Sequence, residues 1–341
     1  MGEFDHLLDI GLFKMAHKEQ KGVLKDFWSR GKNILEGSGV NIQPIPRSWL
    51  SFKRNYFSVL FIAMFHVLGI PKERLRFYSR INHCLRTWVT ACDNLLDEEL
   101  KELILTDLPS EARVFKSVHT ILVADRIFFS YLIDAVKDGT ITEDEMRDLV
   151  NVSLSAMTVS GREEAEEEGG VDYSTSPNEV LGRVHMAKTG VLFTSPLKAP
   201  LALGDIKKND PVVKDVTQGL CYFGLGCQIL DDLSDLGLDL YYRKHNYIAS
   251  LIMSRNGKEK ADISGLLAGE IGEEIKNDTF LYKKFPSASR EAMKVAREQF
   301  ALALDHLCNA GLPLNKKRRA LFLNTLISIM GHPGLLLRLR G

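Results

Sequence analysis

The stretch Gln228-Ile-Leu-Asp231-Asp232-Leu-Ser-Asp235 places three carboxylates close together on a predicted helix. Asp231 and Asp235 are four residues apart and so share one face, with Asp232 beside them. The preceding residues, Phe223-Gly-Leu-Gly-Cys, are apolar, so the helix is predicted to be buried. Carboxylates gathered on a buried helix repel one another unless a cation compensates their charge. We interpret the stretch as a site for a hard divalent ion, Mg2+ carrying a phosphate group; a solvated acidic face is the alternative.

A second acidic cluster lies upstream, at Asp93-Asn94-Leu-Leu-Asp97. Its two aspartates again share a helix face, and Asn94 adds an amide oxygen beside them. Arg86 precedes Asp93 by two helical turns on the same face. Two Asp-rich patches that face one cavity would hold several Mg2+ ions and neutralise a departing diphosphate.

Between the two clusters lies Arg183-Val-His-Met-Ala-Lys188-Thr189-Gly190, where a lysine and a threonine interrupt an apolar helix. Lys188 would act as a point charge for a phosphate oxygen, with Thr189 and the following backbone nearby. The alternative is a lysine whose stem lies on apolar surface while its charge reaches water.

Composition limits the remaining functions. The 341 residues are 45% hydrophobic and 26% charged with a formal net charge of +0, which indicates a globular protein without an overall field for nucleic acid or an anionic membrane. The five cysteines form no CxxC pair, which favours a reducing, cytoplasmic location. The start of the chain lacks the pattern of a signal peptide, and no apolar run is long enough for a transmembrane segment.

Helical periodicity covers most of the chain, and we predict one all-α domain spanning residues 1–341. Thr142-Glu-Asp-Glu145 is a capping-box start, and the run from Glu163 to Glu168 after that helix is interpreted as solvated. Residues 256–285 are interpreted as loop plus a short helix. Helices are predicted within 1–45 and at 51–68, 71–103, 112–137, 142–162, 177–204, 211–239, 245–255, 286–309 and 315–330.

These motifs carry a resemblance to a known family. Asp93-Asn-Leu-Leu-Asp97 resembles the first DDxxD motif of the trans-polyprenyl diphosphate synthases, and the stretch 228–235 resembles the second motif with its preceding Gln. Lys188-Thr189 is similar to the family's Lys-Thr pair, and Asp239-Leu-Tyr-Tyr-Arg-Lys244 is similar to its Asp-Leu-x-x-x-Lys segment. The resemblance covers residues 50–250, with the motifs in the same order.

The resemblance implies a class I isoprenoid synthase fold, a helical barrel around a deep apolar cavity, and a homodimer. It implies Mg2+-dependent ionisation of an allylic prenyl diphosphate, followed by attack of isopentenyl diphosphate on the carbocation. The implied catalytic residues are Lys188, Thr189, Asp231 and Asp93. The implied ligands for several Mg2+ ions are Asp93, Asp97, Asp231, Asp232 and Asp235. The implied diphosphate-binding residues are Lys53, Arg54, Arg86, Lys188, Gln228 and Lys244.

The sequence also departs from this family. Asn94 replaces the usual second Asp, the expected Arg-Arg pair falls near Glu102-Leu103, and an upstream basic motif survives only as Lys53-Arg54. The pocket for isopentenyl diphosphate is therefore depleted. Two alternatives follow: a terpene cyclase that acts on one prenyl diphosphate, and a non-catalytic relative. Trp88 would either shorten the cavity or pack between helices.

Overall fold

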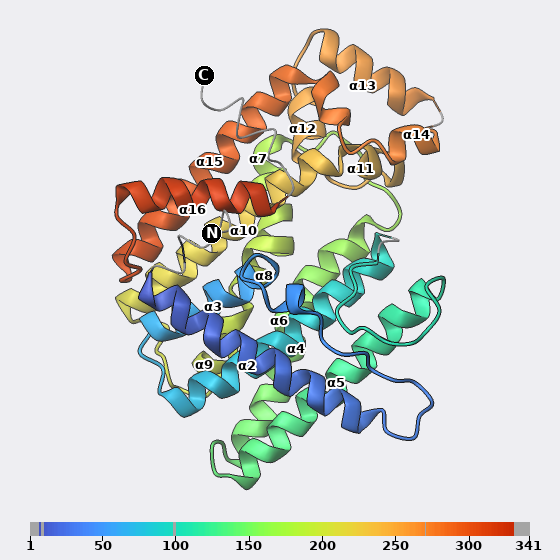
Figure 1. Cartoon of the computed structure of the whole chain (residues 1–341). Coiled ribbons are helices and arrows are strands. Elements are labelled where there is room, and N and C mark those ends of the chain that lie inside the picture. Colours follow the sequence, from blue (N-terminus) through green and yellow to red (C-terminus); the bar gives the residue numbers. More distant parts are fainter. Residues whose placement is uncertain (1–6, 8–9, 98–99, 270, 331–341) are drawn as a thin grey trace. The chain divides into compact units, whose positions relative to one another are not determined.

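The computed structural model describes Leu7 and residues 10–97, 100–269 and 271–330. Parts of the helix expected within 1–45, and residues 331–341 of the predicted domain, lie outside these ranges. Helices dominate the described residues, which confirms the all-α prediction (Figure 1). An isolated antiparallel bridge between Ile42 and Thr106 joins two loops. Every described helix is too short or too polar to cross a lipid bilayer.

The chain divides into two compact units. Unit 1 comprises Met1–Ser153 and Lys198–Lys208, and unit 2 comprises Leu154–Leu197 and Asn209–Gly341. The single domain spanning 1–341 stays a prediction.

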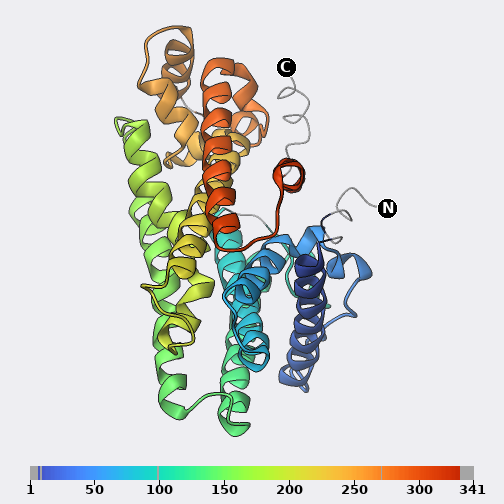
Figure 2. The same cartoon turned by 90° about the vertical axis from the view of Figure 1, so that its left-hand side faces the viewer.

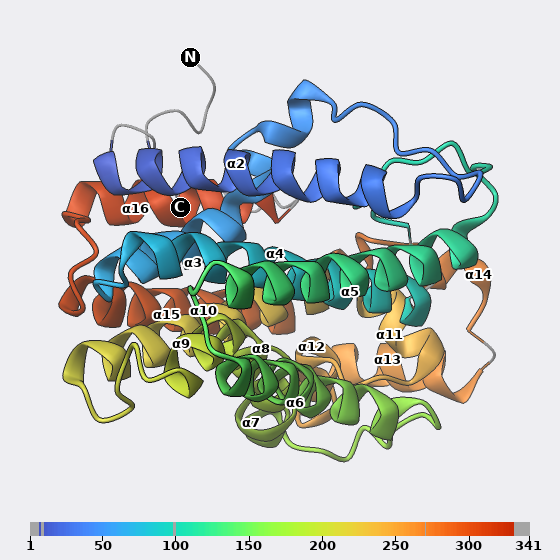
Figure 3. The ribbon, with the colours of Figure 1, turned by 90° about the horizontal axis from the view of Figure 1, so that it is seen from below.

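In unit 1, α4 and α5 pack along each other, and α2 contacts both, as Figure 3 shows. Their shared core contains fully buried aromatic side chains, among them Tyr78 and Phe128. Arg30 of α2 forms an ion pair of 2.7 Å with Asp134 of α5 and lies over the ring of Tyr131. The helices here are α2 (Gly11–Ile34), α3 (Tyr56–Val67), α4 (Lys72–Leu96), α5 (Arg113–Lys137), the first part of α6 (Glu143–Glu167) and α9 (Lys198–Ala202), with the 3-10 turns η1 (Arg47–Leu50) and η2 (Lys53–Asn55).

Unit 2 is built on the pair α10 and α15, which lie side by side (Figure 2). A Cβ at Gly226 of α10 would come within 2.6 Å of the Phe300 ring of α15, so glycine permits this close approach. Besides the end of α6, the elements are α7 (Pro177–Glu179), η3 (Val180–Gly190), α8 (Val191–Phe193), η4 (Ser195–Leu197), α10 (Pro211–Ser234), α11 (Leu236–Tyr242), α12 (Tyr247–Met253), α13 (Lys258–Ala268), α14 (Glu273–Lys276), η5 (Leu281–Lys284), α15 (Pro286–Asn309) and α16 (Lys316–Ile329).

Local sequence explains several helix starts. The capping box is confirmed: the Thr142 amide donates to Glu145 Oε2 at 2.7 Å, and the Glu145 amide donates to Thr142 Oγ1 at 3.2 Å. Asp210 caps α10 ahead of Pro211, because its side chain accepts from the Val212 amide.

Four predicted boundaries were wrong. α4 ends at Leu96 instead of running to 103, and α10 ends at Ser234 instead of 239. The helix predicted for 177–204 is a succession of short elements, of which η3 is a π-helix of 11 residues. α6 continues to Glu167 instead of ending near 162, so most of the glutamate run is helical.

Candidate functional site

The two aspartate pairs occupy equivalent places on their helices. Asp97 is the C-cap of α4 and donates its amide to the carbonyl of Asp93 at 2.9 Å; Asp235 is the C-cap of α10 and donates to Asp231, also at 2.9 Å. The carboxyl end of a helix carries partial negative charge, and the last turn of each helix holds no basic residue. Both helix ends therefore gather negative charge, which favours a bound cation.

The two residues of each pair differ in exposure. Asp93 and Asp231 are exposed, whereas Asp97 and Asp235 are half-buried. Within the described ranges, no group of three or more His, Cys, Asp or Glu side chains is arranged to hold a metal ion. Each pair by itself thus supplies two carboxylates of the kind that suits Mg2+, which takes few protein ligands and keeps several waters.

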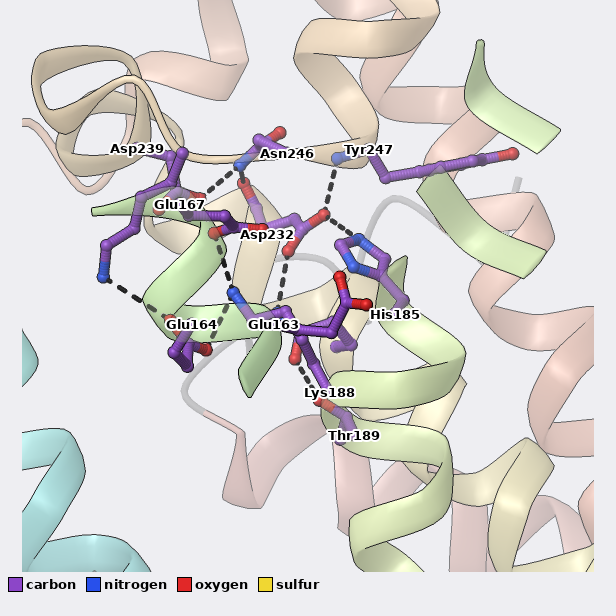
Figure 4. Close-up of polar contacts among 12 residues, drawn as sticks. Glu163, Glu164, Glu167, His185, Lys188, Thr189, Asp232, Asp239, Asn246 and Tyr247 are labelled. Atoms are coloured by element: carbon purple, nitrogen blue, oxygen red, sulfur yellow. Dashed lines mark hydrogen bonds and ion pairs between the residues drawn. The ribbon is translucent and has the colours of Figure 1, made fainter. Parts of the chain in front are cut away.

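Asp232 differs from its neighbours because its carboxylate points into unit 2 and is 1% exposed. Oδ2 lies 2.7 Å from His185 Nε2 and accepts from the Tyr247 amide at 2.6 Å, while Oδ1 accepts from Gln228 Nε2 at 3.0 Å (Figure 4). Burial favours the neutral acid, but His185 and the hydrogen bonds outweigh it and lower the pKa of Asp232. Its role as a metal ligand stays a prediction; in this structure both of its oxygens are held by protein donors.

The carboxylate of Asp232 also fixes the direction of a hydrogen-bond chain. An ionised carboxylate only accepts, so Gln228 must turn its NH2 group toward Asp232 and its carbonyl Oε1 toward Thr189. The hydroxyl of Thr189 then donates to Gln228 Oε1. Gln228 and Thr189, both predicted to serve the substrate, are therefore joined to each other between α10 and η3.

Asn246 holds the segment that follows α11. Its Nδ2 donates to the Asp232 carbonyl and to Asp239 Oδ2, both at 2.8 Å, and its Oδ1 accepts from the first amides of α12. Burial, together with the charges of Asp232 and Asp235, raises the pKa of Asp239 well above its ordinary value. The neighbouring Lys244 is held through its amide, which donates to the Asp239 carbonyl at 2.8 Å.

Lys188 lies inside unit 2, with 8% of its side chain exposed. Its Nζ is 2.8 Å from Glu164 Oε1 and 3.0 Å from Glu167 Oε2, both on α6 (Figure 4). Burial alone would lower the pKa of Lys188, but the two carboxylates raise it above its ordinary value. The prediction that this glutamate run is solvated was wrong at these positions, because Glu167 is buried. The snorkelling alternative for Lys188 is also wrong.

The π-helix η3 positions His185, Lys188 and Thr189. Its wider turns are uncommon and often occur at functional sites. It lies close against α10: a Cβ at Gly224 would come within 2.7 Å of the Thr189 carbonyl oxygen. This close contact allows side chains of η3 to reach both α10 and α6.

The predicted basic residues of unit 1 are grouped near the start of α3. Arg54 lies over the ring of Trp49 at 3.8 Å, and Lys53 is exposed beside it. Arg86 of α4 donates to Ser58 Oγ at 2.9 Å and to the Arg54 carbonyl at 3.2 Å, both uncharged oxygens. Burial and the charge of Arg54 lower the pKa of Arg86 to about 10, so a bound anion would stabilise this pair of cations.

Two further predictions for unit 1 have clear outcomes. Asn94 was expected to offer an oxygen beside the aspartates, but it is buried, and its side chain exchanges hydrogen bonds of 2.9 and 3.2 Å with the backbone of Lys101. Trp88 packs against Phe128 of α5 and donates to the Ile121 carbonyl, so it packs between helices.

The sequence analysis missed His185, Glu164, Glu167 and Asn246. His185 precedes Lys188 by three residues, a spacing that places both near one helix face and could have drawn attention to it. The two glutamates gave no comparable signal, because only the packing of α6 against η3 brings them to Lys188. The aspartate pairs lie in separate units, so a cavity shared between them stays a prediction.

Comparisons with known proteins agree with this all-helical fold. No family model matches the sequence, and no curated protein matches it. Solved structures do match, and they show that the chain has the fold of the trans-prenyl diphosphate synthases.

Three of these structures illustrate the similarity. Geranylgeranyl pyrophosphate synthetase from Pyrococcus horikoshii has 20% identity and a TM-score of 0.60, covering 94% of this chain and 98% of that one. Polyprenyl synthase from Caulobacter crescentus, complexed with calcium and isoprenyl diphosphate, has 15% identity and a TM-score of 0.61, covering 91% and 94%. Octaprenyl pyrophosphate synthase from Helicobacter pylori has 16% identity and a TM-score of 0.59, covering 90% and 98%.

Proposed function

We propose that this chain is a divergent polyprenyl diphosphate synthase, which ionises an allylic prenyl diphosphate with Mg2+ and condenses the cation with isopentenyl diphosphate. One observation carries the proposal: within this fold, both aspartate pairs occupy the last turn and C-cap of a long helix. The carboxyl end of a helix carries partial negative charge, so carboxylates placed there favour a bound cation.

The metal would be held by Asp93 and Asp97 on α4 and by Asp231 and Asp235 on α10. Their oxygen atoms fit a hard divalent ion, and when bound, Mg2+ supplies charge that stabilises a departing diphosphate. Asp232 serves this site indirectly, because it is anchored to His185 and fixes the end of α10 from which Asp231 and Asp235 project.

The diphosphate groups would be bound by the basic residues. Arg86 has uncharged partners and lies beside Arg54, so the two form a cationic site in unit 1 that favours an anion. In unit 2, Lys188 and Lys244 would bind phosphate oxygens, and Gln228 orients Thr189 by accepting a hydrogen bond from its hydroxyl.

A product assay tests the proposal. The protein is incubated with Mg2+, labelled isopentenyl diphosphate and allylic diphosphates from C5 to C20, and the products are separated by chain length. We expect at least one elongated product, which disappears when Mg2+ is chelated. If no allylic substrate is elongated by the folded protein, the transferase proposal fails.

A terpene cyclase is the second candidate, and Glu102 favours it. The expected Arg-Arg pair is replaced here by an acid whose Oε1 pairs with Lys116 at 3.1 Å, and whose carbonyl accepts from Arg54. Positive charge near this position is therefore partly neutralised within the protein. A hydrocarbon or alcohol formed from one prenyl diphosphate without isopentenyl diphosphate would identify this activity.

We also propose that the protein forms a homodimer through α5. This helix carries an exposed apolar stripe whose members recur at three- and four-residue spacing. Two of its members, Phe115 and Ile133, lie equally far from Ala124 on either side of it. Two antiparallel copies of α5 would thus pair each apolar end with the other, as a twofold interface requires. The stripe comprises Val114, Phe115, Val118, Leu122 and Ile133.

A further inference from the structure

Lys188 already has the partners that a cation needs. Glu164 and Glu167 both lie within 3.0 Å of its Nζ, and the Lys244 ammonium is 4.0 Å from the other oxygen of Glu164. Two lysines and two glutamates therefore balance each other's charge in a partly buried group. An approaching diphosphate meets no excess of positive charge in this part of unit 2.

Lys188 would also have to leave a buried carboxylate partner in order to bind a phosphate oxygen. Lys188 and Glu167 are both buried, and burial raises the pKa of Glu167 even though Lys188 is beside it. If Lys188 turned to a phosphate oxygen, Glu167 would remain inside the protein without its main counter-charge, which is strongly unfavourable. The neighbouring Oε1 of Glu167 is buried and already lacks a hydrogen-bond partner.

We propose that Glu164 and Glu167 determine the affinity of this site, because they compete with the diphosphate for Lys188. The inference rests on the proposed function and concerns the same lysine. Binding then exchanges the carboxylate partners of Lys188 for phosphate oxygens, and the cost of that exchange weakens binding. Removing the charge of either glutamate reduces this cost and should tighten binding, whereas a merely structural ion pair would give no such gain.

The test measures binding of inorganic pyrophosphate, with excess Mg2+, to the full chain by titration calorimetry. The variants are Glu167→Gln and Glu164→Gln, which keep the shape of the side chain and one acceptor oxygen while removing the charge. Glu166→Gln is the matched control: it removes the same charge from the same turn, but Glu166 is exposed and pairs with Arg162. Circular dichroism confirms that each variant is folded, and Glu164→Gln, at a less buried position, serves if Glu167→Gln unfolds.

We expect Glu167→Gln and Glu164→Gln each to bind pyrophosphate at least about tenfold more tightly than wild type, a change of the size that one buried charge produces. Glu166→Gln should bind within about twofold of wild type, and Lys188→Met should bind more weakly. The competition of the glutamates for Lys188 is refuted if wild type binds pyrophosphate, Lys188→Met binds it more weakly, and neither glutamine variant binds it more tightly. The proposed function would stand in that case. If no folded variant binds pyrophosphate, both are refuted.

Discussion

Replacing Asp232 with alanine should destabilise the protein far more than replacing its neighbour Asp231. Asp232 is 1% exposed and receives three hydrogen bonds, whereas Asp231 is exposed at the surface of α10. Asp232→Ala leaves the His185 ring N–H and the Tyr247 amide inside the protein without an acceptor. At about 1–3 kcal/mol for each of these two unsatisfied buried donors, the expected loss of unfolding free energy is about 2–6 kcal/mol.

The conservative variant gives an intermediate value. In Asp232→Asn the remaining oxygen can accept from His185 and Tyr247, while the new NH2 group faces Gln228. Gln228 can rotate its amide to accept, and Thr189 can turn its hydroxyl to accept in return. This reversal restores every hydrogen bond with neutral partners, so we expect a loss of about 1–2 kcal/mol. Asp231→Ala should stay within about 0.5 kcal/mol of wild type.

The measurement is urea unfolding followed by far-UV circular dichroism. Tryptophan fluorescence is unsuitable, because Trp28, Trp49 and Trp88 all lie in unit 1. Hydrogen exchange at the start of α12 adds a local test, since the Tyr247 amide loses its acceptor in Asp232→Ala. If the unfolding free energy of Asp232→Ala is within about 1 kcal/mol of wild type, and exchange at α12 is unchanged, the anchoring role is refuted. Asp231→Ala is thus the cleaner test of metal binding.

Three further outcomes are expected. His83 is buried and its pKa is lowered to about 3, so below pH 6.5 this histidine is protonated in the unfolded chain but not in the folded one. The free energy of unfolding should therefore fall by up to about 1.4 kcal/mol for each pH unit between pH 6.5 and 3. Urea titrations at several pH values should show that His83→Leu removes this part of the pH dependence. Gly237→Ala should lower the free energy of unfolding by about 1–3 kcal/mol or more, because its Cβ would lie 2.0 Å from a backbone carbonyl oxygen of α14. Gly265→Ala in α13, where a Cβ would meet no atom within 4 Å, should leave thermal stability unchanged or raise it. Leu122→Glu should convert a dimer into monomers in sedimentation velocity and Leu302→Glu should not; a monomeric wild type contradicts the α5 interface.

The sequence by itself determined the helical class and the places where acids and bases gather. Apolar periodicity and capping residues such as Thr142 are local signals, so most helices appeared where the pattern predicted them. Spacing of four also placed Asp93 with Asp97, and Asp231 with Asp235, on common faces, because such spacing follows from helix geometry alone.

Tertiary structure decided which of these residues face inward. Asp232 and Asn94 look like their neighbours in the sequence, yet both are buried and hydrogen-bonded within the protein. Glu167 resembles a solvated charge until α6 packs against η3 and brings it to Lys188. Burial depends on which helix covers a residue, and that partner is distant in sequence. Local periodicity therefore predicts the helices and their charged faces, while the ionic partners that set the chemistry are fixed only when the helices pack.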